Sequence, residues 1–254
     1  MVYLITALFL SVKSVVYVRS RVRLSFAKWL CFATLWVGMN PVTILFKRLE
    51  HHLPFRVLKI ALTNIVIGLS LLYLVHRLMV FPNFYYPVWL LSLVGFSMIF
   101  HFGLINIMVF CWQIAGIKVM PPFRSPLSSK TLSDFWSKDW NYAFVEMNTI
   151  AVYRPVRRYV GASGALMFTF FVSGIFHEIA ISLPVDAGFG EPLTYFALQG
   201  VLVVLENRIV VKFPQKMKAY GRLYLFLSLL APLPLLFPPD FVHSILFFIV
   251  NAIF

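Results

Sequence analysis

The sequence predicts an all-α protein: a polytopic transmembrane bundle of about eight helices, with a cytoplasmic amphipathic helix between the fourth and the fifth. Hydrophobic residues make up 61% of the 254 residues and charged residues only 12%, whereas a soluble globular domain is about half apolar and about a quarter charged. The apolar residues gather into runs of roughly 20, the length at which a helix crosses the hydrocarbon core of a bilayer. We therefore interpret residues 1–254 as a single membrane-embedded domain, with its polar motifs confined to residues 121–206.

Eight apolar runs follow one another between short loops. They cover roughly Val2–Val18, Phe26–Leu45, Leu58–Leu74, Val88–Ile117, Val160–Leu183, Leu193–Val211, Leu223–Leu236 and Phe241–Phe254. The first is short for a span and carries Lys13. The fourth, at about 30 residues, is long enough to cross with a strong tilt. Proline bends the second run near Pro41 and interrupts the seventh at Pro232 and Pro234, because a proline inside a helix removes one backbone hydrogen bond.

The segment Lys118–Arg158, between the fourth and fifth runs, is the longest polar stretch of the chain. Thr131 and Asp134 stand three apart, as in the capping box that opens a helix. Asp134 and Lys138 are four apart, so they lie on one face of that helix. Aromatic residues interleaved with these charges predict an amphipathic helix that lies along the membrane surface. We expect Pro155 to end it, since proline cannot continue the hydrogen-bond ladder.

The net charge of +13 comes from basic residues in the short loops. Loops after the second, fourth and sixth runs are basic, and those after the third, fifth and seventh are nearly free of Lys and Arg. The positive-inside rule therefore places the first set, with Lys118–Arg158, in the cytoplasm. Arg19, Arg21 and Arg23 break the alternation: either the first run does not cross, or a charged loop is translocated. Bases in these places orient helices and meet anionic lipid, which argues against nucleic acid as the partner.

His177 is an ionisable residue about two thirds of the way along the fifth run. Such residues are costly inside a membrane and point to function. Ser173 lies one turn earlier on the same face. A neutral, desolvated imidazole can act as a general base, although a structural histidine bonded between helices fits the pattern too. Glu178 points about 100° away around the helix, so we expect an ion pair with a basic residue of the central segment.

Three further polar residues are candidates. The Asn141 amide can donate to a thioester or oxyanion oxygen or bind an alcohol, and it can equally make a packing hydrogen bond. Gln199 and Glu206 in the sixth run fit either a cavity lining or bonds between helices. His101 in the fourth run has no polar company, and we interpret it as structural or at best as lining a tunnel.

Basic residues of the central segment stand among aromatic ones. This pattern suits the phosphates and adenine of coenzyme A, and for any single residue a lipid head group explains it as well. The residues are Arg124, Lys130, Lys138, Arg154, Arg157 and Arg158.

Four short motifs occur in order along the segment from Pro121 to Glu206. They are Ser125-Pro126, Leu132 to Asn141, Tyr153 to Arg157, and His177-Glu178. In this combination the chain resembles the membrane-bound O-acyltransferase superfamily, most closely its wax synthase branch. It departs from the related motif of the sterol and diacylglycerol acyltransferases, because Asp139 stands one place later and one tryptophan is missing. The first 110 residues match only as hydrophobic spans.

The resemblance implies transfer of a fatty acyl group from acyl-CoA to a lipid alcohol. His177 and Asn141 would be catalytic and Glu178 supporting. Substrate binding would fall to Phe135, Trp136, Trp140, Gln199, Ser173, Arg124, Lys138 and Arg157. The alternatives are a sterol, terpenoid alcohol, glycan or peptide acceptor, or a small non-enzymatic transporter.

The expected partners are acyl-CoA as co-substrate, the lipid alcohol and membrane lipid. We expect no other cofactor and no metal, because Cys31 and Cys111 both lie in expected spans and form neither a metal-ligand pattern nor a disulfide framework. Several enzymes of the superfamily pair up, so a homo-oligomer is compatible with the resemblance. The expected location is a bacterial plasma membrane or the endoplasmic reticulum.

Overall fold

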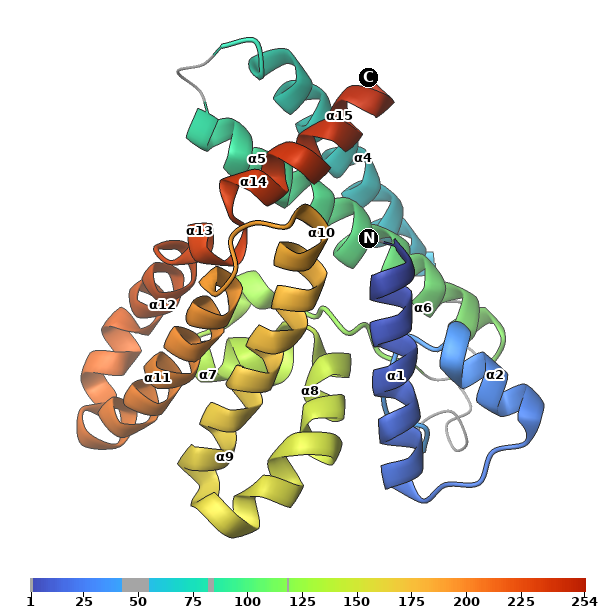
Figure 1. Ribbon diagram of the computed structural model, residues 1–254, viewed down its shortest axis with the longest axis vertical. Coiled ribbons are helices and arrows are strands. Elements are labelled where there is room, and N and C mark those ends of the chain that lie inside the picture. The colour runs from blue at the N-terminus through green and yellow to red at the C-terminus, as the bar shows by residue number, and fades with distance from the viewer. Residues whose placement is uncertain (1, 43–54, 82–84, 118) are drawn as a thin grey trace. The chain divides into compact units, whose positions relative to one another are not determined.

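The computed structural model describes residues 2–42, 55–81, 85–117 and 119–254 (Figure 1). Within these ranges every regular element is a helix and there is no strand, which confirms the all-α class. The chain divides into two compact units. One comprises Met1–Val42 with Pro122–Pro238, and the other Thr43–Pro121 with Pro239–Phe254. The interpretation as a single membrane-embedded domain stays a prediction.

The first unit holds the helices that carry the motifs. Its elements are α1 (Val2–Ser20), α2 (Phe26–Thr34), η3 (Pro126–Ser128), α7 (Leu132–Asp134), η4 (Phe135–Asp139), α8 (Tyr142–Asn148), η5 (Thr149–Tyr153), α9 (Arg154–His177), η6 (Glu178–Ser182), α10 (Leu183–Val185), α11 (Glu191–Lys212), α12 (Pro214–Leu230) and α13 (Leu233–Leu236). The η elements η4, η5 and η6 are π-helical turns within the helical runs. Helix α9 packs along α11, as Figure 1 shows.

The second unit is built on close helix contacts. Its elements are α4 (Phe55–Leu78), α5 (Tyr85–Ser97), η2 (Met98–Leu104), α6 (Ile105–Ile114), α14 (Pro239–Phe241), η7 (Val242–Phe247) and α15 (Phe248–Ile253). A Cβ placed on Gly68 would lie 2.8 Å from the carbonyl oxygen of Gly95 and 2.6 Å from Ile99. Small residues thus let the backbones of α4 and α5 approach closely, as is common between membrane helices.

Six helical runs in the described part of the chain are long and apolar enough to cross a membrane. They are Tyr3–Ser20, Phe55–Leu78, Tyr85–Ile114, Tyr142–Val185, Glu191–Lys212 and Ala219–Leu236. Two of the eight expected spans differ. The run expected at Phe26–Leu45 is helical only over the nine residues of α2, too few to cross, and its end beyond Val42 lies outside the described residues. The last run is the shorter apolar helix Pro239–Ile253.

The run Tyr142–Val185 folds back on itself at Gly161, whose φ of 73° and ψ of −177° break the helix within α9. Glycine adopts this conformation without the steric cost of a Cβ. Pro155, which we expected to end the amphipathic helix, instead lies in the first turn of α9, where a missing N–H is tolerated. The break therefore comes six residues later than the sequence suggested.

The two arms of this helical hairpin, residues 142–160 and 162–185, pack side by side (Figure 1). The Asn148 amide donates to Ser173, and the ring of Phe144 packs edge-on against Phe176. On its other side the first arm buries Ala143 and Met147 against Val16 of α1. The part of the expected amphipathic segment from Tyr142 onward thus forms one arm of the hairpin, and its position along a membrane surface stays a prediction.

Candidate active site

The imidazole of His177 is held by its own helix. Its Nδ1 lies 2.7 Å from the backbone carbonyl oxygen of Ser173. A carbonyl oxygen can only accept a hydrogen bond, so this contact requires the proton to be on Nδ1. In the neutral ring, Nε2 is then the unprotonated nitrogen with a lone pair available to accept a proton.

Aromatic rings surround this imidazole. The ring of Phe196 on α11 lies 4.2 Å from it between centroids, and that of Phe144 on α8 lies 6.5 Å away and nearly perpendicular. His177 itself is half-buried. Three helices therefore meet at the histidine, and the neighbouring rings supply apolar surface rather than a counter-charge. Such surroundings suit a neutral base and a fatty chain.

Ser173 links the histidine to the other arm of the hairpin. Its hydroxyl accepts from the side-chain amide of Asn148 at 3.3 Å and donates to the carbonyl of Thr169 at 2.9 Å. Asn148 is buried, and its Oδ1 has no hydrogen-bond partner. Sequence reasoning missed Asn148. The signal that could have found it is its separation of 13 residues from Gly161, close to the 12 residues between Gly161 and Ser173 on the other side of the bend.

Asn141 stands at the start of α8 in the left-handed region, with φ 48° and ψ 58°. Its Oδ1 accepts from the backbone N–H of Phe144 at 3.2 Å, so it caps the helix. Because Phe144 packs against His177, the cap also fixes one wall of the histidine site. The cap uses the carbonyl half of the amide, and the NH₂ group is the half that can donate to a substrate oxygen.

Trp136 and Gln199 form a second link between elements. The indole N–H of Trp136 donates to Oε1 of Gln199 at 3.1 Å, and Nε2 of Gln199 donates to the carbonyl of Ser228 at 2.7 Å. Gln199 is completely buried, and these bonds occupy both ends of its amide. The Trp136 ring also packs on Phe196, the same ring that contacts His177. The position of the Trp136 ring thus depends on α11 directly and on α12 through Gln199.

Phe135 and Trp140 stack at 5.6 Å, and Phe123 packs edge-on against Trp140 at 5.0 Å. The Arg124 backbone N–H donates to the carbonyl of Asp139, and its guanidinium lies 4.2 Å over the ring of Tyr142. These contacts attach the proline-rich segment before the motif to η4. The aromatic motif therefore forms one folded platform next to the histidine helices.

Glu178 does not form the expected ion pair with any described residue of the central segment. Its Oε1 accepts from the backbone N–H groups of Gly190 and Leu193, at 3.0 and 2.9 Å. These groups open helix α11, whose N-terminus has unpaired donors and a partial positive charge. The hydrogen-bond donors that we expected from a basic side chain thus come from the backbone N–H groups at the start of α11. The Glu178 carboxylate ties the end of α9 to the start of α11.

Glu206 likewise accepts hydrogen bonds from the first backbone N–H groups of a helix, here α7. It is completely buried and accepts from the backbone N–H groups of Leu132 and Ser133, both at 2.8 Å. Thr131 adds the predicted cap, since its hydroxyl accepts from the N–H of Asp134 at 3.0 Å. Of the two interpretations left open for Glu206, these contacts favour bonding between helices. The start of α7 is thereby fixed to α11.

Two other basic candidates, Lys138 and Arg157, make their contacts away from His177. Lys138 is exposed and pairs with Asp134, and this hydrogen bond lowers the pKa of Asp134 and raises that of Lys138. The guanidinium of Arg157 lies 5.9 Å over the ring of Tyr153. Within the described residues no group of three or more His, Cys, Asp or Glu side chains is placed to hold a metal ion.

Residues 119–197 match the model of the membrane bound O-acyl transferase family. This segment contains the aromatic platform, both arms of the hairpin and His177. Over this segment the chain is similar to the membrane bound O-acyl transferase family. Residues 1–118 and 198–254 lie outside the matched segment. The second of these ranges includes Gln199 and Glu206 of α11.

Curated relatives include plant enzymes of one kind. The chain is 31% identical over 106 residues to "Long-chain-alcohol O-fatty-acyltransferase" of Simmondsia chinensis, which covers 38% of this chain and 30% of that one. It is 28% identical over 145 residues to "Probable long-chain-alcohol O-fatty-acyltransferase 2" of Arabidopsis thaliana, covering 52% and 42%. It is also 36% identical over 104 residues to "Diacylglycerol O-acyltransferase 1" of Dictyostelium discoideum, covering 41% and 15%. The matched segments span less than half the length of these relatives.

Proposed function

We propose that the protein is an O-acyltransferase that moves a fatty acyl group from acyl-CoA to a lipid alcohol, with His177 as the general base. The observation that carries this proposal is the bond from His177 Nδ1 to the Ser173 carbonyl, which leaves Nε2 to accept a proton. The histidine lies inside the segment that matches the family. Its aromatic surroundings also suit fatty substrates.

The chemistry asks mainly for a base. An alcohol is a poor nucleophile until its proton is removed, whereas a thiolate leaves readily because thiols have a pKa of about 8.5. In the proposed step Nε2 of His177 takes the hydroxyl proton as the alcohol oxygen bonds to the thioester carbon. The carbon–sulfur bond then breaks, and the proton passes from the imidazole to the departing thiolate. The products are an ester and free coenzyme A.

Asn141 would assist by stabilising the oxygen on which charge develops. Its Oδ1 caps α8, so its NH₂ group is the part that would donate to the thioester oxygen. Trp136, Phe135 and Trp140 would line the acyl chain, with Ser173 and Gln199 holding the helices around it. Arg124, Lys138 and Arg157 would meet the phosphates of coenzyme A. Water is expelled from such a site, which favours ester formation over hydrolysis.

A long-chain alcohol is the acceptor that the relatives support best, because most of their names specify one. The match to a diacylglycerol acyltransferase supports a second candidate, a diacylglycerol acceptor. A sterol, terpenoid alcohol, glycan or peptide remains an alternative from the sequence alone, and so does a small transporter. The acceptor is therefore the first thing to measure.

The proposed orientation puts the basic end of the first unit in the cytoplasm. Arg154, Arg157 and Arg158 stand at the bend of the hairpin, and Lys212 ends α11. Cytoplasmic loops of membrane proteins are enriched in such residues. Coenzyme A would then approach from the cytoplasmic side of a bacterial plasma membrane or the endoplasmic reticulum.

The test is acyl transfer in purified membranes that contain the full chain. Labelled palmitoyl-CoA is offered with fatty alcohols of several lengths, diacylglycerol and sterol, and membranes with His177→Ala serve as the blank. We expect labelled ester from a fatty alcohol in the wild type and none above background in the variant. Ester with diacylglycerol alone would select the second candidate. Equal ester formation in both preparations would contradict the role of His177.

A further inference from the structure

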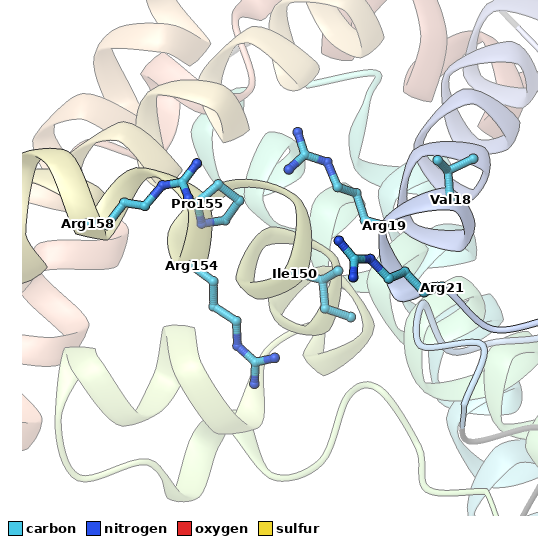
Figure 2. A pocket seen from close by; sticks show the side chains of 7 residues that line it. All are labelled: Val18, Arg19, Arg21, Ile150, Arg154, Pro155 and Arg158. Atoms are coloured by element: carbon cyan, nitrogen blue, oxygen red, sulfur yellow. The ribbon is translucent and has the colours of Figure 1, made fainter.

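A cavity of about 510 Å³ lies in the first unit, away from the aromatic cluster around His177. Its lining comes from the end of α1 and from the bend of the hairpin: Val18, Arg19, Arg21, Ile150, Arg154, Pro155 and Arg158. Figure 2 shows Arg19 and Arg21 extending from the α1 side toward the hairpin bend, Arg158 beside Pro155 on the other side, and the guanidinium of Arg154 turned away from these three. Three guanidinium groups from two distant parts of the chain thus face one opening, and Arg154 lines it as well.

This charge has no acidic partner in the described part of the chain. The ion pair found there joins Lys138 to Asp134, and the residues lining the cavity include no Asp or Glu. The four arginines are exposed. Guanidinium groups bind phosphate oxygens in pairs through their planar fork of donors, which makes arginine the preferred residue for phosphate. The cavity is therefore suited to a phosphate-bearing ligand.

The other residues that line the cavity indicate which class of phosphate-bearing ligand it would bind. Val18, Ile150 and Pro155 are aliphatic, and Val18 is 73% exposed on α1. No described lining residue is aromatic, so no ring is in place to stack on a nucleotide base. An acyl chain, in contrast, can lie along the exposed apolar face of α1. Basic pockets between membrane helices commonly hold anionic lipid head groups.

We infer that this cavity binds the phosphate of an anionic phospholipid. The head group would join the end of α1 to the hairpin bend, where Gly161 reverses the chain. The site also accounts for the arginines that broke the alternation of basic loops, because the end of α1 lies with Arg154 and Arg158.

The site is separate from the chemistry at His177. None of the residues that line the cavity is among those that contact the imidazole, which are Ser173, Phe144 and Phe196. A lipid head group held by the arginines would therefore stabilise the fold and would not take part in acyl transfer. The inference can be tested by binding alone, so it stands or fails independently of the proposed function.

The experiment uses the full chain in nanodiscs of phosphatidylcholine, with or without phosphatidylglycerol, and records the thermal unfolding midpoint. We expect phosphatidylglycerol to raise the midpoint. In Arg19→Gln/Arg158→Gln the lipid concentration for half of this rise should increase about tenfold, the loss expected for one or two charge-assisted hydrogen bonds. Arg208→Gln/Arg222→Gln removes two exposed arginines of α11 and α12 and should respond like the wild type.

Two further arms separate the alternatives. Arg19→Lys/Arg158→Lys keeps the charge but not the planar fork, so we expect it to weaken the lipid response as well. Free coenzyme A added to phosphatidylcholine nanodiscs should act equally on the wild type and the cavity variant. The same loss in the cavity and control pairs would reduce the arginines to general positive charge and overturn the inference. A lost response to coenzyme A with an intact response to lipid would overturn it too.

Discussion

The two compact units differ in how charged side chains take part in joining their helices. Close glycine contacts occur in both: a Cβ on Gly68 would lie 2.8 Å from the carbonyl oxygen of Gly95 in the second unit, and one on Gly174 would lie 3.0 Å from the Cα of Leu193 in the first. In the first unit ionisable side chains also reach across the chain to helix ends: Lys13 donates to the carbonyls of Phe32 and Trp36 at the end of α2, and Glu206 accepts from the start of α7. Polar bonds specify direction and register, whereas apolar contact between small residues mainly specifies distance. The unit that carries the motifs thus adds directional bonds from charged groups to the close packing that both units share.

One histidine in each unit sharpens this contrast. His177 bonds through Nδ1 to the carbonyl of Ser173, and His101 lies with its Nδ1 3.0 Å from the hydroxyl of Ser97. Both partners stand four residues earlier. A carbonyl fixes the proton on Nδ1, but a hydroxyl can donate or accept, so the bond to Ser97 does not choose a tautomer. A general base needs a defined, available nitrogen, and the bond at His177 supplies one.

The largest expected effect on stability comes from replacing Gly161 at the bend of the hairpin. Gly161→Ala puts a side chain at φ 73° and ψ −177°, a conformation that costs other residues about 1–3 kcal/mol. Gly116 in the second unit has a similar φ of 77°, and a Cβ added there would meet no atom within 4 Å, as at Gly161, so Gly116→Ala is the matched control. We expect both variants to unfold at lower temperature. Acyl transfer per folded molecule should fall only for Gly161→Ala.

Loss of transfer in both glycine variants would mean that general destabilisation, and not the geometry of the hairpin, governs activity. Unchanged transfer in Gly161→Ala would show that the bend is not needed to bring Phe144 and Ser173 to the histidine. Unfolding midpoints and initial rates from the same preparations distinguish these outcomes.

A smaller effect is expected from the buried amides. Asn148 and Asn106 are alike: each is buried, each donates once, and each has an Oδ1 without a partner. Asn148 donates to Ser173 on the other arm, and Asn106 to the carbonyl of Phe102 one turn earlier in its own run. We expect Asn148→Leu to lower the free energy of unfolding by about 1 kcal/mol, the net value of one hydrogen bond.

The same change should reduce the rate of acyl transfer more than the affinity for acyl-CoA, because Ser173 carries the bond to His177. Asn106→Leu should leave both the rate of acyl transfer and the affinity for acyl-CoA close to those of the wild type. Equal behaviour of the two variants would remove the link between Asn148 and the histidine.

The smallest effect is the pH dependence of the pair Asp134–Lys138. The hydrogen bond to Lys138 lowers the pKa of Asp134 in the folded protein. Its stabilising contribution is therefore present above the ordinary aspartate pKa of about 3.9 and is lost as the pH falls through the lower folded value. Because the pair is solvent-exposed, the contribution is small. The difference in unfolding midpoint between wild type and Asp134→Asn should shrink in acid and in high salt.

Much of this architecture could be predicted from sequence. Long apolar runs identify helices of membrane length whatever their neighbours, and the cap from Thr131 to Asp134 depends only on local spacing. The motif order also suggested the family whose model matches residues 119–197, a segment that includes His177 and Asn141. These features are decided by the residues themselves or by their near neighbours along the chain.

The rest depended on which elements meet. Pro155 signals an interruption, but its place in the first turn of α9 is harmless, and the bend falls at Gly161. Glu178 needs donors, and sequence cannot tell whether a basic side chain or the start of α11 provides them. Asn148 could be connected with His177 only once the structure showed that the hairpin places it opposite Ser173. In each case a long-range contact chose among partners that local chemistry allows.

The measurement that tests the central claim most directly compares the two histidines. Initial rates of ester formation are recorded for wild type, His177→Ala and His101→Ala, at equal amounts of protein with a single unfolding transition. The account predicts a loss of about 100-fold or more for His177→Ala, the usual contribution of a general base, and a rate for His101→Ala close to that of the wild type. A rate for His177→Ala no lower than that for His101→Ala would contradict the account.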